Sequence, residues 1–128
     1  MPGITRFMPV FLLILSGATA GFAVLPTTHI ARDSESIINQ LANLTPSTPD
    51  ACTGDLKLVS EFIARAEKKA TEDQFEQALT AIKYSQNELR QISYSRPWCK
   101  DVALKLKPIL KGTIDVGREI ERLQKESV

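Results

Sequence analysis

The chain of 128 residues has few aromatic residues and no excess of charge of either sign. Aromatic residues make up 6% of it, which argues against a platform that stacks nucleic-acid bases. The 16 basic and 15 acidic residues leave a formal net charge of +1, so no overall field attracts nucleic acid or a membrane. We therefore expect no nucleic-acid partner, and any preference for an anionic partner must come from a local patch.

Groups that commonly perform catalysis are also scarce. The only histidine, His29, falls in a segment expected to be flexible, away from any nucleophile that it could activate. The sequence has no Gly-rich phosphate loop and no H-E-x-x-H motif. With one histidine and two cysteines, ligands for a metal ion are too few. We expect no catalytic residues, no metal and no cofactor, and an unrecognised enzyme is the minor alternative.

The first 20 residues have the pattern of a secretory signal peptide. Arg6 and the amino terminus form a short positive region, and residues 7–15 form an apolar run. Residues 18–20 then match the A-x-A pattern that signal peptidase recognises, so we expect cleavage after Ala20 or Ala23. The predicted localisation is exported, either periplasmic or secreted.

An uncleaved membrane anchor is the alternative for the same segment. Residues 7–25 are just long enough to cross a bilayer, but Pro9, Ser16 and Gly17 make this stretch a poor span. We expect contact with a membrane through this segment only if it stays uncleaved.

The cysteines Cys52 and Cys99 form an even pair, which in an exported protein predicts a disulfide. A redox-active pair would favour a close C-x-x-C arrangement, which is absent. Closing a loop of this length adds roughly 4 kcal/mol of stability in the chain-entropy model. That is a large fraction of the stability of a small domain.

Apolar periodicity predicts a short first helix over residues 34–44, after a flexible lead-in. Ile37, Leu41 and Leu44 recur at helical spacing, and two prolines within residues 45–50 end the helix. We expect this helix to cover the remaining helices, and the alternatives are that it docks into a partner or swaps between two copies of the chain. Residues 21–54 therefore form a lead-in, a short amphipathic helix and a Pro-containing linker.

A helical bundle is predicted for residues 55–128. Its first helix begins near Asp55 and ends near Ala70. Thr71 and Gln74 fit a capping box for the next helix, which runs to about Ile92. The very short connection predicts an antiparallel hairpin.

Residues 73–82 resemble the second half of a tetratricopeptide repeat. The match consists of Phe75, Ala78, Leu79 and Ile82, with Ala66 near the small position of the preceding helix. Arrays of this family need about three repeats to bury a continuous core, and the chain has no second copy. We therefore interpret the stretch as a tight helical hairpin with small residues at its contact.

The last helix has the strongest periodicity, and Pro97 suits its first turn. Pro108 should bend or split it. We expect this helix to run back alongside the helix that starts near Asp55, which brings both cysteines to one end. The predicted fold is a small all-α, up-down bundle of three main helices and a short N-terminal helix, with one disulfide. The apolar seam of the last helix consists of Cys99, Val102, Leu106, Ile109, Thr113, Val116, Ile120 and Leu123.

Basic residues recur beside this seam at helical spacing and form a stripe. The stripe can engage an anionic surface or an acidic protein, or it can be a solvated face that pairs with acids on other helices. For the second case the available acids are Glu61, Glu67, Glu76 and Glu88. The stripe consists of Lys100, Lys107, Lys111, Arg118, Arg122 and Lys125.

Trp98, the only tryptophan, stands directly before Cys99. We expect it to pack over the disulfide, and the alternative is an exposed anchor for a partner.

Together these features predict an exported binding protein whose partner is another protein. An accessory or chaperone-like component of a bacterial envelope or secretion assembly is the favoured role. A secreted inhibitor or effector, or a membrane-tethered structural protein, is the alternative.

Overall fold

The structure is a computed structural model that describes residues 26–127, apart from the side chain of Ser47. The predicted signal peptide and both cleavage sites lie outside the described residues. Of the helices in the described part of the chain, none combines the length and the apolar character that a bilayer span requires.

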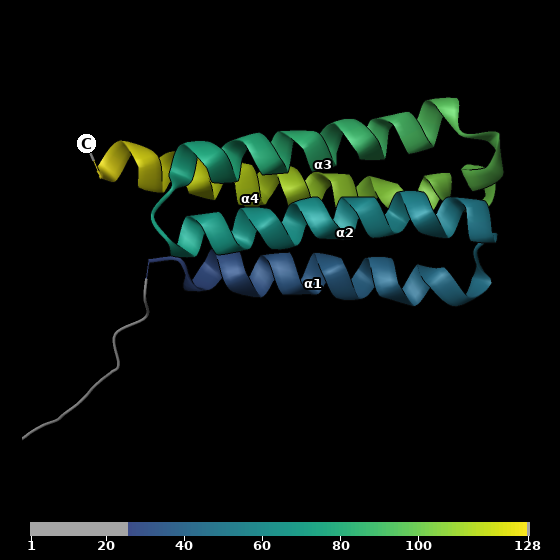
Figure 1. Ribbon diagram of the computed structural model, residues 1–128, viewed down its shortest axis with the longest axis horizontal. Helices are drawn as coiled ribbons and strands as arrows, with labels where there is room; N and C mark the ends of the chain where they lie inside the picture. The colour runs from purple at the N-terminus through teal and green to yellow at the C-terminus, as the bar shows by residue number, and fades with distance from the viewer. Residues whose placement is uncertain (1–25, 128) are drawn as a thin grey trace, which may run out of the picture.

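Four α-helices form an up-down bundle, which confirms the predicted all-α fold (Figure 1). Residues 26–127 contain no strand. The helices are α1 (Thr28–Leu44), α2 (Asp50–Thr71), α3 (Phe75–Ser95) and α4 (Leu106–Glu126), joined in part by the 3-10 segments η2 (Thr45–Ser47) and η3 (Pro97–Lys105).

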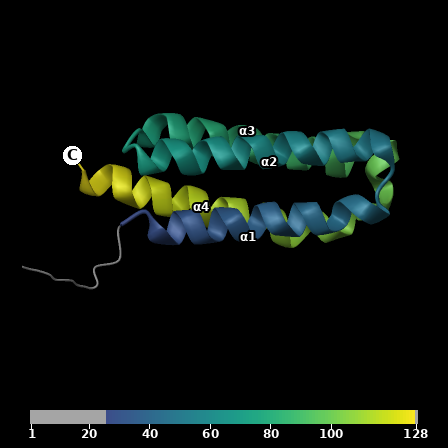
Figure 2. The same cartoon turned by 60° about the horizontal axis from the view of Figure 1, so that its bottom comes forward.

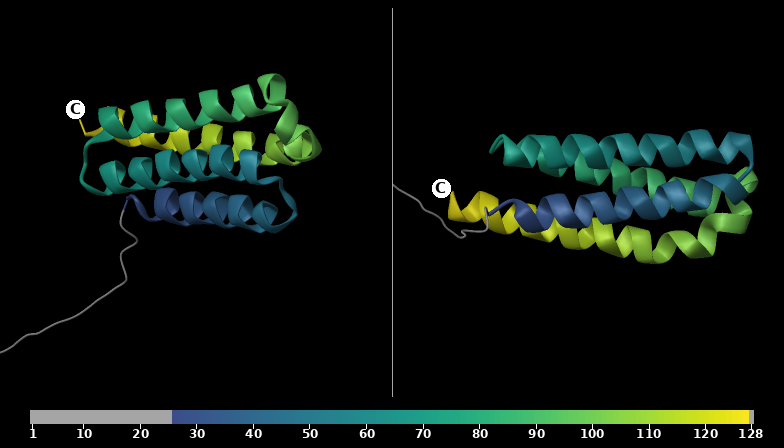
Figure 3. Two further views of the ribbon diagram at one scale, coloured as in Figure 1. Left: turned by 45° about the vertical axis from the view of Figure 1, so that its right-hand side comes forward. Right: turned by 90° about the horizontal axis from the view of Figure 1, so that it is seen from below.

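The helices pack in two layers, with α1 beside α4 in one and α2 beside α3 in the other (Figure 2). Contacts also join α1 to α2 and α3 to α4, so each helix touches its neighbours around a closed ring. The prediction that the last helix lies alongside α2 is therefore wrong, since α4 packs against α3 and α1 (Figure 3).

The seam predicted for the last helix is confirmed, since all of its residues are buried, including Thr113. The α2–α3 hairpin is also confirmed, and small buried residues such as Ala66, Ala70, Ala78 and Ala81 allow its helices to approach closely. These apolar faces meet between the two layers and form one core that runs along the bundle.

The N-terminal helix is longer than predicted. It begins at Thr28, so residues 28–32 are helical and His29 lies exposed on α1, where it contacts Arg32. Ile30, Ser34, Ile37 and Leu41 form its buried stripe. Ser34 interrupts the apolar pattern of this stripe, which explains why the sequence pattern placed the helix start too late. The stripe packs against α2 and α4, so α1 covers the rest of the bundle.

Two other predicted helix starts are wrong. The α2 helix begins at Asp50 directly after Pro49, five residues before Asp55, and Cys52 therefore lies inside its first turn. The capping box is not formed: Thr71 Oγ1 donates a hydrogen bond back to the Glu67 carbonyl, and no side chain caps α3. Asp73, with a φ of 61°, makes the tight turn in its place.

The last predicted helix is divided at Leu106. Residues from Pro97 to Lys105 form the 3-10 segment η3, and α4 follows. Pro108 therefore lies in the first turn of α4, where the missing N–H costs no hydrogen bond. The split predicted from Pro108 is present, but it precedes the proline.

Candidate functional site

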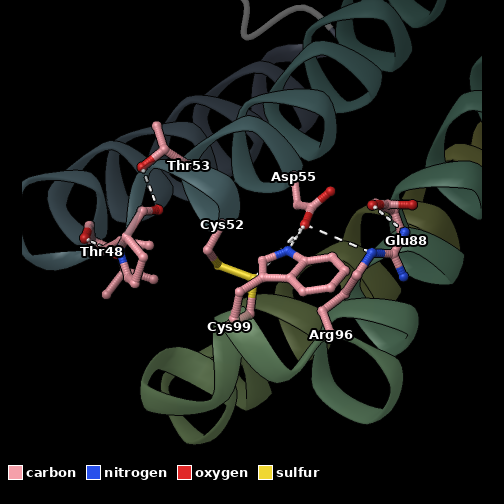
Figure 4. The surroundings of a disulfide bond; sticks show 10 residues. Thr48, Cys52, Thr53, Asp55, Glu88, Arg96 and Cys99 are labelled. Carbon is pink, nitrogen blue, oxygen red and sulfur yellow. Dashed lines mark hydrogen bonds and ion pairs between the residues drawn. A yellow bond between two sulfur atoms is a disulfide. The ribbon is translucent and has the colours of Figure 1, made fainter.

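The predicted disulfide joins Cys52 of α2 to Cys99 of η3, with their Cα atoms 5.2 Å apart (Figure 4). Both cysteines are buried, with exposed fractions of 0% and 1%. A buried disulfide is shielded from attack by thiolates, which fits a structural role. The bond is also compatible with an oxidising compartment.

A polar network beside the disulfide ties η3 to α2 and α3. The Trp98 indole donates from Nε1 to Asp55 Oδ2 over 2.8 Å. Arg96 Nε lies 3.7 Å from the same carboxylate oxygen, and Arg96 Nη2 lies 3.4 Å from Glu88 Oε2 (Figure 4). Trp98 is 46% exposed, so one side of its ring faces solvent. The network holds η3 in a defined position relative to the helices.

An apolar hollow of about 210 Å³ lies between the end of α3, η3 and the start of α4, and we call it the α3–η3 groove. Two large side chains at this groove are conspicuously exposed: Tyr94 is 87% and Leu104 is 77% accessible. Leu106 is buried and Leu110 is half-buried. The groove is defined here by Arg90, Tyr94, Leu104, Leu106, Lys107 and Leu110.

The charges at the α3–η3 groove have one sign. Arg90 of α3 and Lys107 of α4 both line the groove, and both are exposed. None of the residues that line it is acidic. Sequence reasoning missed Tyr94, Leu104 and Arg90, since they fit no seam and only the turn between α3 and α4 brings them together. Lys107 is the one residue shared by the groove and the predicted stripe.

The six predicted stripe residues are all exposed, and five of them lie on α4. With 3.6 residues per turn, those five fall within about 60° around the helix. They face away from the buried stripe of α4, so the prediction that they lie next to the apolar seam is wrong. Lys100 lies on η3.

The ion pairs that the basic stripe residues form all lie within α4. Lys111 Nζ lies 3.3 Å from Asp115 Oδ2, and Arg122 pairs with Glu119 and Glu126. The hydrogen bond from Arg122 lowers the pKa of the Glu119 carboxyl, and it raises the pKa of Arg122.

Glu88 is one of the four acids on neighbouring helices that were expected to pair with the basic stripe. It pairs instead with Arg96, which is not a stripe residue. Between residues 26 and 127, no ion pair joins the stripe to another helix. Within the same range, Lys100, Lys107, Arg118 and Lys125 make no ion pair, so these cations are available to a partner.

A second hollow, of about 230 Å³, lies between α2 and α3 and is lined by Arg65, Lys69 and Tyr84 among others. Its aromatic residue already has a partner, because the Tyr84 and Phe62 ring centroids are 5.5 Å apart. The Arg65 guanidinium in turn lies 5.5 Å from the Phe62 ring. The α3–η3 groove, with its much more exposed apolar residues, is the stronger candidate for binding.

The described part of the chain has no group of three or more His, Cys, Asp and Glu side chains that could hold a metal ion. A scan against protein-family models and searches of curated proteins and of solved structures found no match to this chain.

Proposed function

We propose that this chain is an exported helical protein that acts by binding another protein. The role we favour is that of an accessory or chaperone-like component of a bacterial envelope or secretion assembly. Export is supported by the signal-peptide pattern of the first 20 residues and by the disulfide. The bacterial setting is inferred from the compact chain and its signal peptide.

The exposure of Tyr94 and Leu104 beside one hollow is the observation that carries the binding function. Fully burying a leucine side chain that is exposed in the free protein gains roughly 1.5–3 kcal/mol. The disulfide and the Trp98–Asp55 hydrogen bond hold η3 in place before a partner arrives. A surface that is already ordered loses less conformational entropy on binding.

The test is a pull-down of tagged, natively exported protein from its own host, followed by mass spectrometry. We expect one envelope or secretion component in stoichiometric amount with the wild-type protein, and its loss with Leu104→Ser. The matched control is Leu58→Ser, which removes an exposed leucine, 39% accessible, from α2. Recovery of no specific partner by the wild-type protein would contradict the proposed function.

Export is tested separately by the intact mass of the protein purified from its host. A mass that corresponds to cleavage after Ala20 or Ala23 supports an exported, processed protein. An intact N-terminus in the membrane fraction would favour the membrane-tethered alternative.

A further inference from the structure

We infer that the partner segment is an acidic peptide with one large apolar side chain, which inserts between Tyr94 and Leu104 and directs its carboxylates toward Arg90 and Lys107. This inference rests on the proposed function, because it specifies the chemistry of the partner. It commits to a peptide of a different protein as the occupant of the α3–η3 groove.

The apolar part of the inference follows from the groove itself. Tyr94 and Leu104 are 87% and 77% exposed, and the groove is also lined by Leu106, which belongs to the core, and by Leu110, which packs against the core. A hollow of about 210 Å³ is small, so it suits one large side chain better than a folded surface. One inserted side chain would cover both exposed residues at once.

The acidic part follows from the charges. Arg90 and Lys107 line the groove from two different helices, and no acid lines it. Neither makes an ion pair within residues 26–127. A carboxylate can therefore approach either cation without first displacing an acid of this chain.

The stripe on α4 predicts where further acids lie in the peptide. Lys111 follows Lys107 by one helical turn, which is about 6 Å along the helix axis. Its pair with Asp115 is exposed, with side chains 78% and 49% accessible, so it is weak and can exchange for a partner's carboxylate. An extended peptide advances about 3.3 Å per residue, so a second acid about two residues beyond the first can reach Lys111.

A second copy of this chain is a poor occupant of the groove. A symmetric dimer through this face would place Arg90 and Lys107 against the same cations of the other copy. Like charges brought together at an interface are unfavourable. The charges thus favour an acidic peptide over self-association.

The test uses short synthetic peptides and amide NMR spectra of the isotope-labelled, disulfide-bonded protein. The probe has one phenylalanine followed by three aspartates. One control peptide replaces phenylalanine with serine, and another replaces the aspartates with lysines. We expect the probe to shift the amide signals of Tyr94, Leu104 and Lys107 most, and both controls to bind at least about tenfold more weakly.

Variants then separate the two parts of the inference. We expect Leu104→Ser to weaken the probe roughly tenfold, while Leu58→Ser leaves it unchanged. The double variant Arg90→Glu with Lys107→Glu should lose the acidic probe and bind the lysine peptide instead. Lys57→Glu, at an exposed position of α2, is the charge control, and it should neither weaken the acidic probe nor allow the lysine peptide to bind.

Several results would overturn the inference. These are absence of probe binding at millimolar concentration, signal shifts centred away from the groove, and equal binding of the acidic and basic peptides. A dimer in sedimentation that Leu104→Ser abolishes would assign the groove to a second copy. Binding to anionic vesicles that needs Leu104, without peptide binding, would assign it to a membrane.

The pull-down distinguishes failure of this inference from failure of the proposed function. If a host partner is retained by Leu104→Ser, the binding function stands and the α3–η3 groove is not its site. If the probe binds at the groove and the host yields no partner, the groove chemistry stands and the proposed function fails.

Discussion

The Trp98 indole N–H donates a hydrogen bond to the Asp55 carboxylate, 2.8 Å away, across 43 residues of sequence and directly beside the Cys52–Cys99 disulfide. The same carboxylate lies 3.7 Å from Arg96 Nε. One acid of α2 therefore fixes both the start of η3 and the residue before it. These contacts hold η3, which lines the α3–η3 groove, in a fixed position. They matter because η3 is a 3-10 segment, whose hydrogen bonds are less well aligned than those of an α-helix.

Trp98→Phe should lower the free energy of unfolding by about 1 kcal/mol or more, because it removes the hydrogen bond and replaces the indole with a smaller aromatic ring. Asp55→Ala should cost more, since Arg96 then loses one of its two acids. Urea unfolding of both single variants and of the double variant gives the coupling between the two residues. Additive effects would show that the hydrogen bond contributes nothing to stability.

Removal of the disulfide by Cys52→Ala with Cys99→Ala should lower the free energy of unfolding by up to roughly 4 kcal/mol, as expected for a loop of this length. The helices pack around a closed ring, so circular dichroism should show nearly unchanged helix content at low temperature. The measurement is thermal and urea unfolding under oxidising conditions. An unchanged midpoint would contradict a structural role for the disulfide.

Two glycines inside helices should respond differently to alanine. At Gly54 of α2 an added Cβ meets nothing within 4 Å, so Gly54→Ala should stabilise the protein by about 0.5–1 kcal/mol through helix propensity. At Gly112 of α4 the Cβ would lie 3.1 Å from Ile37 Cδ1 of α1, which offsets that gain.

The control for the glycine pair is Gly112→Ala combined with Ile37→Val, which removes Cδ1, the nearer of the two crowded Ile37 atoms. Urea unfolding should show that Ile37→Val is less harmful in the alanine background than in the wild-type background. Equal stabilisation by Gly54→Ala and Gly112→Ala would contradict the close approach of α1 and α4.

Stability should depend on pH through Glu67 of α2. Partial burial raises the pKa of its carboxyl above 4.5, and the neighbouring Glu35 of α1 adds to the effect. The neutral form is therefore favoured in the folded state. The stability that the folded state gains by holding the Glu67 proton more tightly is fully present below pH 4.5. It is lost as the pH rises through the raised pKa of Glu67.

Glu67→Gln, which resembles the neutral form, should therefore stabilise the protein at pH 7 and have little effect at pH 4. Glu35→Gln should also remove the repulsion between Glu35 and Glu67. The double variant should therefore gain less stability than the sum of the gains of the two single variants. Thermal unfolding across this pH range measures both. The control is Glu61→Gln, an exposed acid on the same helix; an equal pH response there would contradict the assignment to Glu67.

Much of the fold followed from local patterns. Helical periodicity predicted the all-α class, the α2–α3 hairpin and a seam on the last helix that is entirely buried. The even pair of cysteines predicted the disulfide. These features are accessible from sequence because the spacing of apolar residues along a helix is a property of the local chain.

The beginning of α1 was missed for an equally local reason. Ser34 is completely buried, but its polar side chain interrupts the apolar pattern that joins Ile30 to Ile37. The sequence could not show that α1 packs against α4, because close contact at Gly112 depends on how two distant helices meet. The order of the helices around the ring was missed for the same reason.

By itself, the sequence determined the helical class, the disulfide pair and the basic residues of the last helix, because each depends on residue types and spacing. Only the tertiary structure decided that α4 lies beside α1 and α3, that its basic stripe faces away from the core, and that Tyr94 and Leu104 border one hollow with Arg90 and Lys107. The physical reason is that a groove is built from residues on different elements. Their approach is set by the turn after α3 and the packing of whole helices, which no local spacing encodes.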